Sequence, residues 1–157
     1  MRPPARRSRE KEPLLENSGP IQKHVTDWND TDFFRWPGLR LISAEDGVSR
    51  VELLVEKHHR GGGGSPNAIN GGIVSYMFDG LLRAAVASTW EETTIGQATI
   101  ALNVNFLDAI EAEARVTGEA RVVRGGGGLV YCEGRVWDES GKTGATCTGI
   151  YRIFRRR

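Results

Sequence analysis

Residues 67–87 constrain the fold of this chain more than any other stretch. The segment contains the pair Gly71 and Gly72, which an almost unbroken apolar run follows. Ala, Leu and Met favour helix, and the run is long enough for about four turns. Apolar residues fall on every face, which predicts a helix that is buried on all sides. They are Ile73, Val74, Met77, Phe78, Leu81, Leu82, Ala85 and Val86.

One carboxylate, Asp79, lies in the middle of this apolar run. Burying an Asp costs free energy unless the carboxylate is paired or hydrogen-bonded. Arg83 follows one helical turn later and could neutralise Asp79 as an i,i+4 ion pair. Alternatively, Asp79 takes part in chemistry. The sequence leaves both interpretations open.

The start of the helix is a second candidate site. The first backbone N–H groups of a helix are unpaired and form the positive end of its dipole. Without side chains at Gly71 and Gly72, another molecule can approach closely, and a carbonyl oxygen placed there would be polarised. A plain helix start capped by Asn70 or Asn67 explains the same residues equally well.

The spacing of these two sites indicates an oligomer. Asp79 lies eight residues after Gly71, which is ~12 Å along a helix axis. A single chain therefore cannot bring both groups to one small reacting carbon. Two antiparallel copies of the helix across a two-fold axis could do so, so we expect at least a homodimer with the site at its interface, or a homotetramer.

The rest of the chain reads as strands. Two strand-like runs precede the helix and four follow it, each bounded by turn signals. In the second run before the helix, Val51, Leu53 and Val55 would face the core. In the first run after the helix, Ile100, Leu102, Val104 and Phe106 recur with a period of two. We predict an α+β fold in which an antiparallel sheet wraps one long central helix. The expected strands span residues 38–44, 48–55, 98–107, 112–124, 129–137 and 143–154.

Several other classes of site fit poorly. Residues 57–66 read as a flexible loop, because their glycine run lacks the Gly-Lys-Ser/Thr ending of a phosphate loop. His58 and His59 are adjacent at a strand end and would point to opposite faces, so we expect no metal site and no cofactor. Cys132 and Cys147 could be cross-strand neighbours on either side of the turn at 138–141, and we expect them to be reduced.

Charge and the terminal segment set further limits. A net charge of +1 gives no general reason to expect a nucleic acid partner. The helical run is under ~18 residues and carries charge, which argues against a membrane span. Residues 1–19 lack an apolar period and should form a disordered tail, with a single domain over residues 20–157. No apolar secretory segment follows the first arginines, so we expect a cytoplasmic protein.

Two stretches resemble a known family. They are N-A-I-N-G-G-x6-D, which ends at Asp79, and T-I-A-L-N-V-N-F-L, which begins at Thr99. Together with the strand–turn–strand pattern around D-E-S-G-K, they are similar to the PaaI-like acyl-CoA thioesterases of the hot-dog fold. The resemblance covers roughly residues 34–154. Asn70 stands where most members of that family carry His.

The resemblance implies hydrolysis of an acyl-CoA thioester without metal or cofactor. It places Asp79 as general base or nucleophile, Gly71 as the N–H that polarises the thioester carbonyl, and Thr99 as a hydroxyl that helps hold the attacking water. We assign substrate binding to Asn67, Asn70, Gly72 and Arg83. The alternative is a non-catalytic hot-dog module that binds an acyl thioester.

Overall fold

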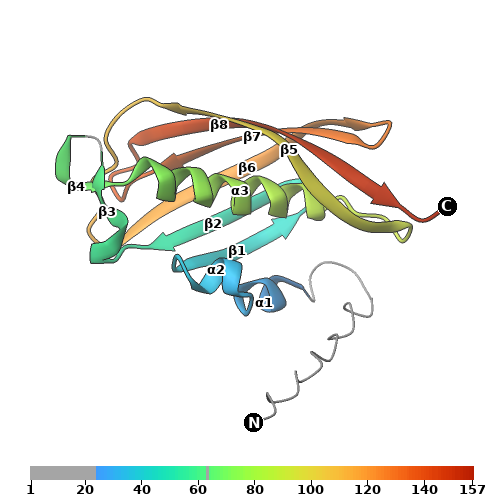
Figure 1. Ribbon diagram of the computed structural model, residues 1–157, viewed down its shortest axis with the longest axis horizontal. Coiled ribbons are helices and arrows are strands. Elements are labelled where there is room, and N and C mark those ends of the chain that lie inside the picture. The colour runs from blue at the N-terminus through green and yellow to red at the C-terminus, as the bar shows by residue number, and fades with distance from the viewer. Residues whose placement is uncertain (1–23, 63) are drawn as a thin grey trace, which may run out of the picture.

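The computed structural model describes residues 24–62 and 64–157, so the tail expected at residues 1–19 lies outside the described part. Six antiparallel strands form one sheet in the order β1-β2-β6-β7-β8-β5, and the long helix α3 packs against its concave face (Figure 1). A short hairpin, β3–β4, stands apart from this sheet. The main elements are α1 (His24–Asn29), α2 (Asp32–Arg35), β1 (Leu39–Glu45), β2 (Val48–Leu54), β3 (Arg60–Gly62), β4 (Ser65–Ile69), α3 (Gly71–Ala87), β5 (Thr94–Phe106), β6 (Arg115–Gly126), β7 (Leu129–Trp137) and β8 (Thr143–Arg155).

Helix α3 begins and is capped as its sequence predicts. The Asn70 side chain accepts a 2.8 Å hydrogen bond from the N–H of Gly72, and the first helical bond runs from Val74 N to Asn70 O at 3.1 Å. The prediction of burial on every side is only partly right. Gly72, Tyr76, Asp79 and Arg83 form one stripe that stays exposed or half-buried, because these spacings of three and four residues share a helix face.

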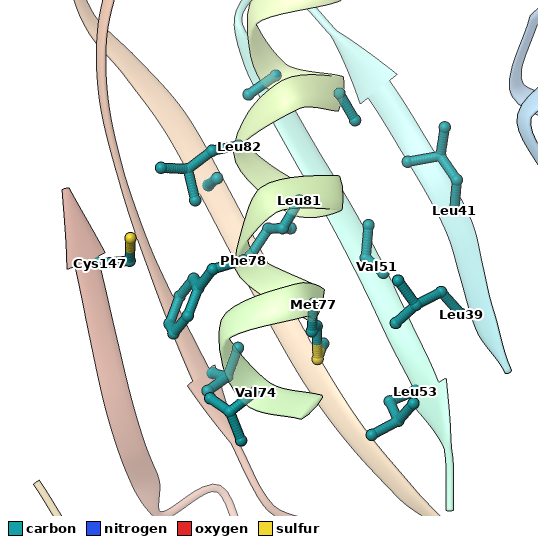
Figure 2. Close-up of a cluster of buried hydrophobic side chains, with 14 of the residues drawn as sticks. Leu39, Leu41, Val51, Leu53, Val74, Met77, Phe78, Leu81, Leu82 and Cys147 are labelled. Atoms are coloured by element: carbon teal, nitrogen blue, oxygen red, sulfur yellow. The ribbon is translucent and has the colours of Figure 1, made fainter. Parts of the chain in front are cut away.

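The other faces of α3 pack closely on the sheet. Figure 2 shows Val74, Met77, Phe78, Leu81 and Leu82 in the core, with strand residues on both sides. All five are at most 1 % exposed. Glycines on the neighbouring strands β6, β7 and β8 allow this approach. A Cβ added at Gly118 would lie 2.8 Å from Leu81, and one added at Gly149 would lie 2.6 Å from Leu82.

The two edges of the sheet differ. At the β1 edge, the Asn29 side chain bonds both polar backbone groups of Leu41, donating to its oxygen at 3.0 Å and accepting from its nitrogen at 2.7 Å. A side chain that occupies an edge in this way blocks pairing with another chain. The β5 edge is long, and its apolar residues Ile95, Ile100 and Phe106 are 58, 56 and 57 % exposed. It is the edge that is left open for another strand.

Strand β5 departs from the predicted pattern. It begins at Thr94 rather than near residue 98, and its pairing with β8 shifts register between Thr99 and Ala101. The shift is a bulge, which places Ile100 outside the regular alternation. Ile100 and Phe106 are therefore exposed in the single chain, whereas Leu102 and Val104 pack partly against the core.

Two smaller predictions also need correction. Residues 57–66, expected as a loop, contain a 3₁₀ turn at Lys57–His59 and most of the β3–β4 hairpin. Cys132 pairs with Gly149 rather than with Cys147, because Trp137 faces Thr143 instead of Lys142 and the β7–β8 register shifts by one more residue between Val136 and Trp137. Both cysteines are free and buried, as expected for packing thiols. Within the described residues, no helix is long and apolar enough to span a membrane.

Candidate active site

Asp79 lies at the middle of α3, on the side that faces β5 and β8. Thr99 Oγ1 donates a 2.8 Å hydrogen bond to Asp79 Oδ1. Thr99 is exposed in the single chain and Asp79 is half-buried, so the pair opens toward the free β5 edge. The sequence prediction placed both residues in one site, and the structure brings them together.

A third residue, Tyr151 on β8, completes the surroundings of this carboxylate. It is paired with Thr99 across the sheet. Its ring is fully buried, and its hydroxyl lies 3.4 Å from Asp79 Oδ1 and 3.3 Å from the Asp79 backbone oxygen. Sequence reasoning missed Tyr151. The available signal was a tyrosine in the alternating core face of β8, because a buried tyrosine hydroxyl normally requires a polar partner.

The groups that face Asp79 from β8 are neutral. Burial, reinforced by the Asp79 charge, raises the pKa of Tyr151 far above its usual range, so its hydroxyl remains a hydrogen-bond donor. Burial is also the main reason that the pKa of Cys147 is raised to about 11. On α3 itself, burial and the Asp79 charge raise the pKa of Tyr76. In the described part of the chain, Asp79 is thus held by neutral hydroxyl donors and not by a cation.

Arg83 does not form the i,i+4 ion pair with Asp79 that the sequence allowed. Instead its guanidinium carbon lies 5.5 Å from the centroid of the Trp28 ring and 5.9 Å from that of Phe33. Aromatic faces attract cations at such distances, and these rings belong to the α1–α2 segment that covers this side of α3. The interpretation of Asp79 as a purely structural partner of Arg83 is therefore wrong.

The start of α3 presents an unpaired backbone donor. Asn70 caps Gly72, whereas the N–H of Gly71 has no acceptor within residues 24–62 and 64–157. A Cβ at residue 71 would lie 3.3 Å from the Phe106 ring, so glycine lets the end of β5 approach the helix start. Asn67 is not the cap: it is exposed on β4, and its backbone oxygen accepts a 2.9 Å hydrogen bond from the Arg60 side chain.

Histidine pairs and acidic clusters do not add a metal centre to this site. His59 is fully buried, and its Nδ1 accepts a 2.9 Å hydrogen bond from the Glu56 N–H. His58, the residue before it, is exposed. Across the described ranges, no group of three His, Cys, Asp or Glu residues is placed to hold a metal ion. The acidic groove beside the 138–141 turn has a structural role, because the Glu139 carboxylate accepts three hydrogen bonds from backbone N–H groups there.

Comparison with known proteins adds a family to this geometry. Residues 67–145, just over half of the chain, match the family described as the thioesterase superfamily. A candidate esterase of Saccharolobus solfataricus is 27 % identical over 124 residues, which cover 79 % of this chain and 84 % of the relative.

Solved structures share the architecture. The PaaI protein from the phenylacetic acid degradation operon of E. coli has a TM-score of 0.73 at 19 % identity, and covers 85 % of this chain and 91 % of its own. A thioesterase family protein from Silicibacter pomeroyi has a TM-score of 0.74 at 21 % identity. The match covers 87 % of this chain and 99 % of that protein. At these identities the likeness shows the fold, which is the hot-dog fold that the sequence resemblance implied.

Proposed function

The chain belongs to the thioesterase superfamily, and from that premise we propose that it is an acyl-CoA thioesterase that releases a free acid and CoA. The observation that carries this proposal is the carboxylate of Asp79, held by Thr99 at 2.8 Å on an otherwise apolar helix. A module that only binds or dimerises has no need of a carboxylate there. We expect the proposed thioesterase to act in the cytoplasm.

The reaction requires a group that activates water and a group that stabilises the developing oxyanion. As a general base, Asp79 takes a proton from water while the water oxygen attacks the thioester carbonyl carbon. The C–S bond then breaks, and the thiolate leaves and is protonated. As a nucleophile, Asp79 instead attacks the carbonyl carbon itself, and the C–S bond breaks as the CoA thiolate leaves and is protonated. Water then hydrolyses the resulting mixed anhydride, which frees the acid and regenerates the Asp79 carboxylate. Both routes use the same carboxylate.

The oxyanion would be stabilised by the N–H of Gly71. Among the described residues this donor has no acceptor, and it lies at the positive end of the α3 dipole. Asn70, Gly72 and Asn67 lie at or beside this helix start, and Arg83 lies on the same stripe as Asp79; we propose that these residues line the path of the substrate. All four of these residues are exposed in the single chain.

A complete site needs two chains. Gly71 and Asp79 are separated by ~12 Å along one helix, so the polarising N–H must come from the partner subunit's Gly71. We propose that two copies pair through their β5 edges, because β1 is blocked by Asn29 while β5 is open and apolar. The result is a homodimer, or a homotetramer of two such dimers.

A panel of acyl-CoA substrates with a free-thiol readout tests the proposal. Cys132 and Cys147 are buried, and burial raises their pKa values to about 12 and about 11, so the protein itself contributes little thiol signal. Turnover that depends on Asp79 supports the enzyme. Acyl-CoA binding without turnover by any member of the panel would instead support the non-catalytic binding module.

A further inference from the structure

Asp79 has two carboxylate oxygens, and the structure treats them differently. Thr99 Oγ1 lies 2.8 Å from Oδ1, and the Tyr151 hydroxyl lies 3.4 Å from the same Oδ1. Oδ2 has no hydrogen-bond partner within the described parts of the chain. The single hydrogen of the Tyr151 hydroxyl is shared between Oδ1 and the Asp79 backbone oxygen, which lies 3.3 Å away, so neither donor reaches Oδ2.

We infer that Tyr151 is a positioning residue that, together with Thr99, fixes Oδ1 of Asp79 and leaves Oδ2 as the oxygen that reacts. This inference rests on the proposed hydrolysis of a thioester. A carboxylate held at one oxygen cannot rotate freely about its χ2 torsion, so its second oxygen is oriented before substrate arrives. Orientation of this kind contributes to rate and not to substrate affinity.

The core packing around Tyr151 fixes the position of its side chain. Its ring is fully buried, and Gly149, two residues earlier on the same face of β8, leaves room for it. A Cβ at Gly149 would lie 3.2 Å from Cε2 of the Tyr151 ring and 3.3 Å from the sulfur of Cys132. The ring cannot swing away without disturbing the core, so the hydroxyl stays beside Asp79.

The hydroxyl is also in the required protonation state. Burial and the nearby Asp79 charge keep Tyr151 protonated at every working pH, so it can donate but cannot compete as a base. Its contacts at 3.3 and 3.4 Å are long, as hydrogen bonds of catalytic groups often are before substrate binds. We therefore expect an effect at the lower end of the range for a hydrogen bond to a charged group.

The test compares Tyr151→Phe with a matched control, Tyr131→Phe. Tyr131 lies on the adjacent strand β7, but it is 43 % exposed and takes no part in the site. We expect Tyr151→Phe to lower kcat about tenfold, equivalent to ~1.4 kcal/mol, with KM changed less than about twofold. Tyr131→Phe should keep both constants. Thr99→Val should also lower kcat, and Thr99→Ser, which restores a hydroxyl, should recover it.

A second readout does not depend on turnover. In protein labelled with ¹³C at the Asp carboxyl groups, the Asp79 signal is identified by its loss in Asp79→Asn. Tyr151→Phe should change the chemical shift of that signal at neutral pH, because a hydrogen-bond donor to the carboxylate is lost, whereas Tyr131→Phe should leave it unchanged. The groups around this carboxylate are Thr99 on β5, Cys147 and Tyr151 on β8, and Tyr76 and Arg83 on α3.

The two readouts separate the inference from the proposed function. If the parent hydrolyses acyl-CoA and Tyr151→Phe keeps its kcat and its Asp79 chemical shift, the inference is wrong and the proposed function stands. If no substrate is hydrolysed, the proposed function fails. In that case an Asp79 signal with the same chemical shift in the parent and Tyr151→Phe overturns the inference as well, whereas a changed chemical shift supports the hydrogen bond.

Discussion

The contact between α3 and the sheet can be tested by adding a single methyl group at Gly149. A Cβ there would lie 2.6 Å from Leu82 Cδ2, 3.2 Å from the Tyr151 ring and 3.3 Å from the sulfur of Cys132. All three neighbours are buried, so none can move into solvent. We expect Gly149→Ala to destabilise the protein.

The magnitude follows from two opposing effects. Overpacking a core costs about 1–3 kcal/mol, and replacing glycine by alanine in a strand recovers about 0.5–1 kcal/mol of backbone entropy. The net loss is then at most about 2.5 kcal/mol, and the 2.6 Å approach to Leu82 favours the upper part of that range, about 1–2.5 kcal/mol. Such a loss lowers the melting temperature by about 2–10 °C for a chain of this size. Urea unfolding monitored by tryptophan fluorescence measures the free energy of unfolding directly.

Gly125→Ala provides the matched control. Gly125 lies on β6, and the nearest atom to its added Cβ is Val130 Cγ2 at 3.8 Å, an ordinary contact distance. This variant should equal the parent in stability or exceed it slightly. If Gly149→Ala is as stable as Gly125→Ala, the helix does not rest on the sheet as closely as described, and the reason given for glycine at this position is wrong.

Three further predictions concern pH, the open edge and the thiols. Burial, and secondarily His58, lowers the pKa of His59 below 6.5. The unfolded chain therefore binds a proton at His59 more readily than the folded chain does. The stability that comes from His59 is fully present above about pH 6.5 and falls as the pH drops toward the folded-state pKa. The loss of melting temperature between about pH 7.5 and about pH 5.5 should shrink in His59→Asn and persist in the exposed control His58→Asn; equal losses in both would contradict the assignment. Ile100→Lys places a charge on the open β5 edge and should give an inactive monomer by sedimentation, whereas Val123→Lys, on an exposed residue of β6, should leave the oligomer intact; a dimeric Ile100→Lys would move the interface elsewhere. Cys132 and Cys147 should react with a thiol reagent only at the rate of unfolding, since burial raises the pKa of both; rapid labelling of the native protein would show that the core opens.

Local sequence patterns were sufficient for most of the fold. The apolar run with a glycine pair predicted α3, and alternation with turn signals predicted the six strands of the main sheet, because these patterns depend on near neighbours in the chain. Val51 and Leu53 were expected to face the core, and both are fully buried. The turn at 138–141 also forms, with a hydrogen bond from Gly141 N to Asp138 O.

The errors arise where structure depends on distant contacts. The pairing of Trp137 with Thr143 and a register shift next to it together displaced the predicted Cys132–Cys147 pair, and a bulge at Ile100 interrupted the alternation of β5. The period-two pattern of β5 does not show that this strand is an edge. The role of Tyr151 depends on pairing with Thr99 across the sheet and on the position of α3, and neither is encoded in the residues next to it. Asp79 was identifiable because a charge within an apolar helix is anomalous in the local sequence alone.

The central claim is that the carboxylate of Asp79 performs the chemistry, and single-turnover hydrolysis by Asp79→Asn tests it most directly. The amide conserves shape but can neither accept the proton nor attack, so folding and acyl-CoA binding should be kept while the rate falls ~10²- to 10⁴-fold. Asp46→Asn is the matched control, because Asp46 is exposed in the β1–β2 turn and its positive φ of 48° suits asparagine. A folded, substrate-binding Asp79→Asn that hydrolyses acyl-CoA as fast as the parent and Asp46→Asn would contradict the account.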